Sequence, residues 1–225
     1  MIENGIGASV RRKEDIRFLT GKGNYTDDVN VVGQTYAYFV RSPHAHATIN
    51  SIDTSVASSS DGVIAVFTGD DLAADGIGPL ICGVNVTGDD GEPHKAPAHP
   101  ALAQGKVNYV GDHVAVVIAE TLDQAKDAAE KVGVDYGILA AVTDTATASD
   151  DAQQQIHAEA PNNICYNWPF GEKEAVNDAF SSAHKIASLE LVNNRMVTNP
   201  MEPRAAVGDF NSGTEEITLH LTTQN

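Results

Sequence analysis

The sequence predicts an α+β or α/β domain that ends near Val142 and is followed by a second unit. A continuously apolar run, Val114 to Ala119, is typical of a strand buried on both faces. A helix should follow, because Thr121-x-x-Gln124 forms a capping box and apolar residues then recur at helical spacing until Gly133. Val134-Asp135-Tyr136 resumes a strand. This order of strand, helix and strand predicts the mixed fold class.

The residues before this motif predict turns and further strands. The first thirty residues are polar and glycine-rich, so we expect turns there rather than a regular element. Three strand-like stretches follow, at Gln34 to Val40, Ala45 to Ile49 and Val63 to Phe67. Thr68 to Asp71 can begin a brief helix. Residues 76–100 are rich in glycine and proline and predict a long loop.

The remaining residues predict a linker and an incomplete second domain. Residues 143–160 contain few large hydrophobic side chains, as expected of an interdomain linker. A helix is expected over Lys173–Ala183, and strands over Ile186–Val192, Ala205–Phe210 and Ile217–Thr222. The last strand runs into the chain's final residues without a turn. We therefore expect a fragment or one piece of a split subunit, with residues 1–142 as the first domain and 161–225 as the start of the second.

The composition excludes several classes of function. Asp and Glu number 31 against 14 Lys and Arg, a formal net charge of -17 that opposes binding to nucleic acid or anionic membranes. Two cysteines, Cys82 and Cys165, are too few for an iron–sulfur cluster. Met1 to Gly5 show neither the basic start nor the apolar core typical of a signal peptide, and no apolar run approaches the roughly 18 residues of a membrane span, so a cytoplasmic location is expected.

No catalytic motif stands out from the residues alone. His44 and His46 could share one face of a strand, but no third metal ligand has compatible spacing, and packing roles are favoured over a metal site. Gly21-x-Gly23 does not open a helix after a strand, so a dinucleotide site is not indicated. We therefore predict neither a catalytic residue nor a metal ligand on this basis.

Several blocks, in order, do resemble one enzyme family. They are Gly7 to Asp28, Arg41 to Ala47, Gly62 to Leu72, His99 to Ala103, Val107 to Ala115, Val134 to Val142, Asn199 to Ala205 and Thr222 to Asn225. Together they resemble the large, molybdopterin-binding subunit of aerobic carbon monoxide dehydrogenase and its xanthine dehydrogenase and aldehyde oxidase relatives. The resemblance implies an opening segment and α/β hammerhead domain over 1–142, then the truncated start of the α+β molybdopterin-binding domain.

The family resemblance also implies a chemistry. A molybdenum ion carried by a pyranopterin dithiolene would supply it, oxidising carbon monoxide or hydroxylating an aldehyde or N-heterocycle with oxygen derived from water. Electrons would leave through iron–sulfur clusters and FAD on a small and a medium companion subunit, in a dimer of heterotrimers. Of the positions present, only Gln224 matches the active site, where its amide N–H would stabilise charge on oxygen. The isolated chain should be inactive.

Two positions depart from the family pattern. Asn108 stands where an arginine is usual, and Ala140 replaces a proline, so the contacts at these positions should differ. The block Met201-Glu202-Pro203-Arg204 favours the carbon monoxide dehydrogenase branch, and a structural pairing of its Glu and Arg is expected. The alternative function is a non-catalytic module that docks or assembles subunits of such a complex. An unrelated hydrolase that uses His44 and His46 is a more remote alternative.

Overall fold

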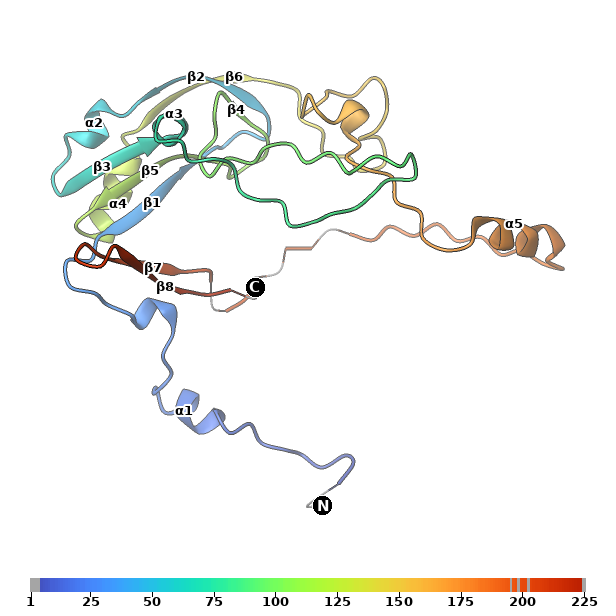
Figure 1. The fold of residues 1–225 in the computed structure, drawn as a ribbon, viewed down its shortest axis with the longest axis horizontal. Coiled ribbons are helices and arrows are strands. Elements are labelled where there is room, and N and C mark those ends of the chain that lie inside the picture. The colour runs from blue at the N-terminus through green and yellow to red at the C-terminus, as the bar shows by residue number, and fades with distance from the viewer. Residues whose placement is uncertain (1–4, 195, 198, 202, 224–225) are drawn as a thin grey trace. The chain divides into compact units, whose positions relative to one another are not determined.

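The structure, a computed structural model, describes residues 5–194, 196–197, 199–201 and 203–223. The chain forms two compact units. One unit is Thr35–Ser188, and the other combines the residues up to Gln34 with those from Leu189 onward. Figure 1 shows the helices and strands of both units.

The larger unit contains a three-stranded antiparallel sheet with β5 at its centre. The strand order is β1 (Tyr36–Arg41), β5 (His113–Ala119) and β3 (Val63–Thr68). Helix α4 (Leu122–Ala129) contacts all three strands, and its alanines pack against the sheet (Figure 1). The Thr121 half of the predicted capping box forms, because the Thr121 hydroxyl accepts the Gln124 backbone N–H at 3.2 Å. The Gln124 side chain accepts the Thr121 hydroxyl at 2.8 Å rather than the Thr121 backbone N–H, so the reciprocal half does not form.

A second sheet of the same unit carries the other part of the core. Its order is β4 (Lys106–Val107), β2 (Ala47–Asp53) and β6 (Gly133–Ile138), again antiparallel. Val107 and Val114 are fully buried there, and Tyr136 packs against them. Short helices α2 (Ser55–Ser58) and α3 (Gly69–Ala74) flank β3. The sequence predicted the brief helix α3 but not α2.

The long loop and the predicted linker have no strand or α-helix among their described residues. Within 76–100, a single bridge joins Thr87 and Pro93. Residues 143–160 form turns, followed by the 3₁₀ turn η2 (Pro161–Asn163). Helix α5 (Lys173–Ser182) forms where the sequence predicted a helix, with every residue exposed. None of the helices in the described part of the chain is long and apolar enough to cross a membrane.

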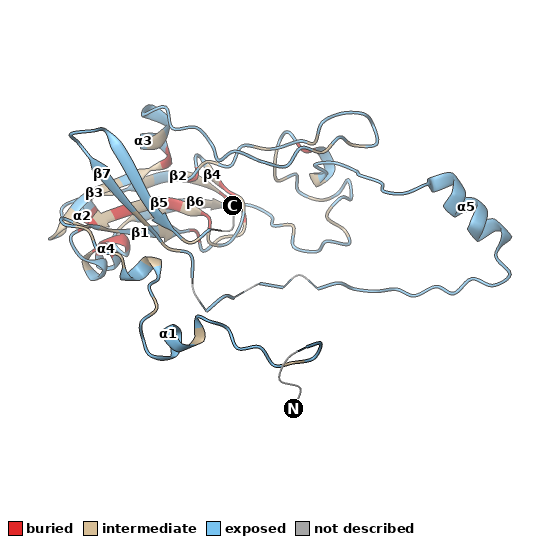
Figure 2. Cartoon of the chain, turned by 60° about the horizontal axis from the view of Figure 1, so that its bottom comes forward, coloured by how far each residue is buried: buried red, intermediate tan, exposed pale blue. Residues whose placement is uncertain are grey.

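The smaller unit contains an antiparallel hairpin, β7 (Ala206–Asn211) and β8 (Glu216–Leu221). It also contains helix α1 (Asp15–Leu19) and the 3₁₀ turn η1 (Thr26–Asp28), so the opening residues are not turns alone. In Figure 2 the two larger sheets and α4 contain buried residues, whereas β7 and β8 are almost wholly exposed.

One predicted strand was wrong. Ile186–Val192 has no regular structure, and Leu189, Leu191 and Val192 are each about four-fifths exposed. Its composition suits a strand, but a strand needs a neighbour for its backbone hydrogen bonds, and the described residues provide none there. The mixed α+β class itself is confirmed.

Candidate functional site

A cavity with a volume of about 760 Å³ lies within the smaller unit. One wall consists of η1 and the residue before it, and the other is the stretch that leads into β7. The lining residues are Tyr25, Asp27, Asp28, Met201, Pro203, Arg204 and Ala205. This cavity therefore brings together two of the family-like blocks, which lie more than 170 residues apart in the sequence.

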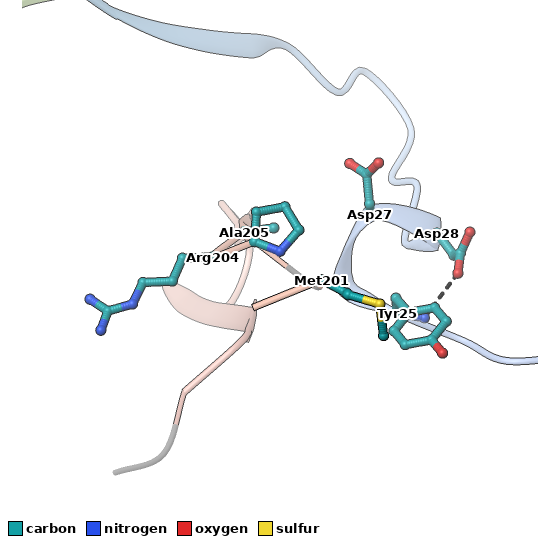
Figure 3. Close-up of a pocket in the computed structure, with 7 residues that line it drawn as sticks. Tyr25, Asp27, Asp28, Met201, Arg204 and Ala205 are labelled. Carbon is teal, nitrogen blue, oxygen red and sulfur yellow. Dashed lines mark hydrogen bonds between the residues drawn. The ribbon is translucent and has the colours of Figure 1, made fainter. Parts of the chain in front are cut away.

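Hydrogen bonds within a local turn fix the first wall of the cavity, which consists of Tyr25 to Asp28. The Asp28 carboxylate accepts the Tyr25 backbone N–H at 2.9 Å, and the Asp28 backbone N–H donates to the Tyr25 carbonyl at 3.0 Å. This pairing closes η1 and fixes the Tyr25 ring, which stacks on Phe18 with ring centroids 6.1 Å apart. In Figure 3 the Met201 side chain extends toward Tyr25, while the Arg204 guanidinium points away from both.

The hairpin is fastened to both walls through Thr222. Its backbone N–H donates to the Ala205 carbonyl at 3.1 Å. Its hydroxyl lies 3.2 Å from the Thr26 hydroxyl, where either oxygen can be the donor. The end of β8 is thereby fixed beside the cavity. Gln224, the predicted cofactor-binding residue, lies outside the described residues, and so does Glu202.

The cavity offers two carboxylates, one guanidinium, a phenol and a thioether. Carboxylates accept hydrogen bonds from N–H groups such as those of a pterin, and the Tyr25 ring and Met201 supply apolar contact. Among the described residues, no group of three or more His, Cys, Asp or Glu could hold a metal ion. A metal that is held by the dithiolene sulfurs of a pterin does not need a group of protein ligands. The side chains that line the cavity are therefore compatible with a metal carried by a pterin.

The two histidines singled out in the sequence do not form a pair on one strand. Both precede β2, in a bend. The His44 ring meets Tyr136 edge-on with centroids 4.9 Å apart. His46 is 2% exposed, and its Nδ1 lies 2.8 Å from the Ala140 carbonyl oxygen. That carbonyl can only accept, so Nδ1 carries the proton and the buried Nε2 is left without a partner. Both imidazoles therefore pack within the hammerhead sheets.

Sequence reasoning missed the cavity residues Tyr25, Asp27 and Asp28. They belong to the opening family-like block, but nothing in their spacing points to residues 201–205. Only the fold brings the two blocks together, and no periodicity or motif in a single sequence could have indicated it.

Comparison with known proteins identifies two family models. The model described as aldehyde oxidase and xanthine dehydrogenase, a/b hammerhead domain, matches residues 20–140, which is more than half of the chain. The model of the molybdopterin cofactor-binding domain matches residues 156–225.

Individual relatives agree with these matches. The chain is 37% identical to the nicotine 6-hydroxylase large subunit of Paenarthrobacter nicotinovorans, covering 98% of this chain and 26% of that protein. It is 34% identical to the carbon monoxide dehydrogenase large chain of Afipia carboxidovorans, covering 98% and 27%. It thus spans about a quarter of the length of these curated relatives.

Solved structures show the same likeness. Quinoline 2-oxidoreductase from Pseudomonas putida matches with a TM-score of 0.81 at 33% identity, over 97% of this chain and 27% of that one. Carbon monoxide dehydrogenase from Oligotropha carboxidovorans matches with a TM-score of 0.79 at 33% identity, over 96% and 27%. The predicted hammerhead domain and the beginning of a molybdopterin-binding domain are confirmed. The chain belongs to the family of aldehyde oxidase and xanthine dehydrogenase, whose members include the molybdenum-binding large subunits of carbon monoxide dehydrogenase.

Proposed function

We propose that this chain supplies the hammerhead domain and the first part of the cofactor site of a molybdenum hydroxylase. The molybdopterin-bound metal would provide the redox chemistry, transferring water-derived oxygen to the substrate and accepting its electrons. The substrate would be carbon monoxide, an aldehyde or an N-heterocycle. Companion subunits with FAD and iron–sulfur clusters would accept the electrons, in a complex located in the cytoplasm. The isolated chain would be inactive.

Within this function, Gln224 is the residue that we propose to contact the cofactor. A side-chain amide N–H donates a hydrogen bond to an oxygen that gains charge during the reaction, and such donors act strongly where water is excluded. The observation that carries the proposal is the anchoring of Thr222, two residues earlier, to Ala205 and Thr26 beside the cavity. A fixed Thr222 restricts the positions open to an amide that follows so closely.

The domain boundaries form part of the same proposal. We place the opening segment and hammerhead domain in 1–142, a linker in 143–160 and the beginning of the molybdopterin-binding domain in 161–225. The family models support these limits, since the first ends at residue 140 and the second begins at residue 156. The compact units are divided differently, because Tyr25 to Asp28 pack with the C-terminal stretch rather than with the sheets.

The test is to purify the native complex through a tag on this chain and to measure molybdenum, iron and flavin together with turnover. We expect stoichiometric molybdenum. Gln224→Ala should keep the metal but lower kcat by about 100-fold, the usual effect of removing one such donor. Gln154→Ala, at an exposed position of the predicted linker, is the matched control and should leave kcat unchanged.

Two outcomes would contradict the proposal. A native complex without molybdenum would favour the alternative, a non-catalytic module that docks subunits. The apolar side chains of the long loop give that alternative its support, since Ile81 is 96% exposed and Leu80 is 59% exposed. Full turnover of Gln224→Ala would remove the role of this residue and leave the family assignment intact.

A further inference from the structure

A second cavity, of about 260 Å³, lies wholly within the larger unit. Its lining comes from the end of the long loop, from the residues around β4, and from the end of the predicted linker and the residues that follow it. Each of the three contributes a basic side chain, namely His99, Lys106 and His157. Basic groups are scarce in a chain of net charge -17, so their convergence on one cavity suits an anion rather than a cation.

Lys106 is a half-buried cation without a counter-ion. Its ammonium donates a short hydrogen bond to the Ile156 carbonyl. In the part of the chain that the structure describes, no carboxylate forms an ion pair with it. An ammonium has three N–H donors, so donors remain for a ligand in the cavity. A charge removed from water is stabilised by an opposite charge close by, which an anionic ligand would supply.

Asn108 adds an unsatisfied acceptor. Its backbone N–H donates to the Asp112 carboxylate at 3.1 Å, but its side-chain Oδ1 is buried and has no hydrogen-bond partner. A buried acceptor without a donor is unfavourable, and a ligand that brings an O–H or N–H relieves it.

Two acidic groups lie near these basic side chains, Asp112 in the lining and Glu159 close to His157. Asp112 also lines the cavity, where it accepts the Asn108 N–H. Burial, followed by the charge of Asp112, raises the pKa of Tyr109, whose hydroxyl lies 3.2 Å from His99 Nε2. Burial and the charge of Lys106 lower the pKa of His157, and Glu159 opposes them. An anion in the cavity would raise the pKa of His157, as Glu159 does, and would favour the protonated form of its imidazole.

We propose that this cavity binds a small protonated oxyanion of the class represented by hydrogen phosphate. The anionic oxygens accept N–H groups from Lys106 and His157, and the O–H of the anion donates to Asn108 Oδ1. A tetrahedral oxyanion fits a cavity of 260 Å³ with water to spare, since one water takes about 30 Å³. Sulfate has the same shape but no O–H at neutral pH, so it would place an oxygen lone pair against Oδ1.

The experiment is calorimetric titration of the full chain with inorganic phosphate and with sulfate, in a buffer without either anion and at constant ionic strength. We expect saturable 1:1 binding of phosphate that is at least about tenfold tighter than that of sulfate, the discrimination expected of one buried hydrogen bond. Asn108→Leu keeps a similar volume and removes the acceptor. It should bring the ratio of the two affinities close to one.

Lys106→Met should weaken both anions together by at least about tenfold, while Lys126→Met, at an exposed position of α4, should change neither. Unchanged hydrogen exchange of the β5 amides shows that each variant is folded. The proposal is overturned if neither anion binds saturably to the parent chain, if sulfate binds as tightly as phosphate, or if folded Asn108→Leu keeps the preference.

Discussion

Strands β5 and β8 have similar lengths, yet one is largely buried and the other is exposed. β5 lies between β1 and β3 and contacts α4, and Ala115, Val117 and Ala119 are fully buried. β8 pairs with β7 alone, and all of its residues are exposed. The comparison shows that the burial of a strand depends on how many elements cover it.

This difference has an energetic consequence, because an apolar side chain stabilises the fold only when it leaves water. The free energy of unfolding should therefore respond to substitutions in the larger unit and hardly at all to equivalent substitutions in the hairpin. Matched pairs of residues, one from each unit, test that expectation.

The largest difference is expected between Val117→Ala and Leu219→Ala. Val117 is 0% exposed among the alanines of α4, whereas Leu219 is 62% exposed. Val117→Ala should lower the free energy of unfolding by about 2 to 3 kcal/mol, through lost burial and the cavity left behind. Leu219→Ala should change it by less than about 0.5 kcal/mol. Native-state hydrogen exchange of the amides in each strand measures both, and equal losses would contradict the comparison.

A smaller difference is expected between Gly69→Ala and Gly208→Ala. A Cβ on Gly69 would lie 2.4 Å from the Ala103 carbonyl oxygen and 2.9 Å from that of Leu102, both backbone atoms that cannot easily move. A Cβ on Gly208 meets nothing nearer than Leu219 Cδ2 at 3.5 Å.

Gly69→Ala should therefore destabilise the larger unit by about 1 to 3 kcal/mol. Gly208→Ala should be neutral or stabilise the hairpin by up to about 1 kcal/mol, because alanine loses less backbone entropy on folding. Hydrogen exchange at the β3 and β7 amides reports on each site separately. A stable Gly69→Ala variant with unchanged exchange would show that the backbone beside α3 has room to shift.

The same comparison explains how much of the fold the sequence could predict. β5, the Thr121 cap of α4 and the helix at Lys173–Ser182 depend on local spacing and capping, and all were predicted to within a few residues. The strand expected at Ile186–Val192 was wrong, since a strand depends on a hydrogen-bonded partner strand that local composition does not reveal.

The candidate site was less predictable for the same reason. The resemblance pointed to Gln224, which stays a prediction. Tyr25 and Met201 line the cavity beside Thr222, and His99 and His157 line the cavity that we propose to bind an oxyanion. Both sites depend on contacts between segments that no motif links. The buried Oδ1 of Asn108, which has no hydrogen-bond partner, could not be predicted either, because the sequence does not show which side-chain atoms the fold buries.

The smallest difference is expected between His113→Gln in β5 and His220→Gln in β8. The His113 ring stacks on Phe39 with centroids 4.5 Å apart, and burial, then the charge of Arg41, lowers the pKa of His113. His220 is exposed. Because the unfolded chain binds a proton at His113 more readily than the folded chain, the stability of the larger unit should fall as pH drops below the ordinary value of about 6.5.

Between pH 7.5 and 5.5, the free energy of unfolding of His113→Gln should decrease less than that of the parent chain. Part of the decrease should remain, because burial also lowers the pKa of His157. His220→Gln, at an exposed position of the hairpin, is the matched control and should leave the slope of the larger unit unchanged. The effect is small because the His113 ring is only half-buried and water screens part of the shift. Hydrogen exchange of the β5 amides across this pH range measures the slope. An unchanged slope in His113→Gln would mean that the buried sheet does not hold this imidazole neutral, and the contrast between the two strands would then be limited to apolar packing.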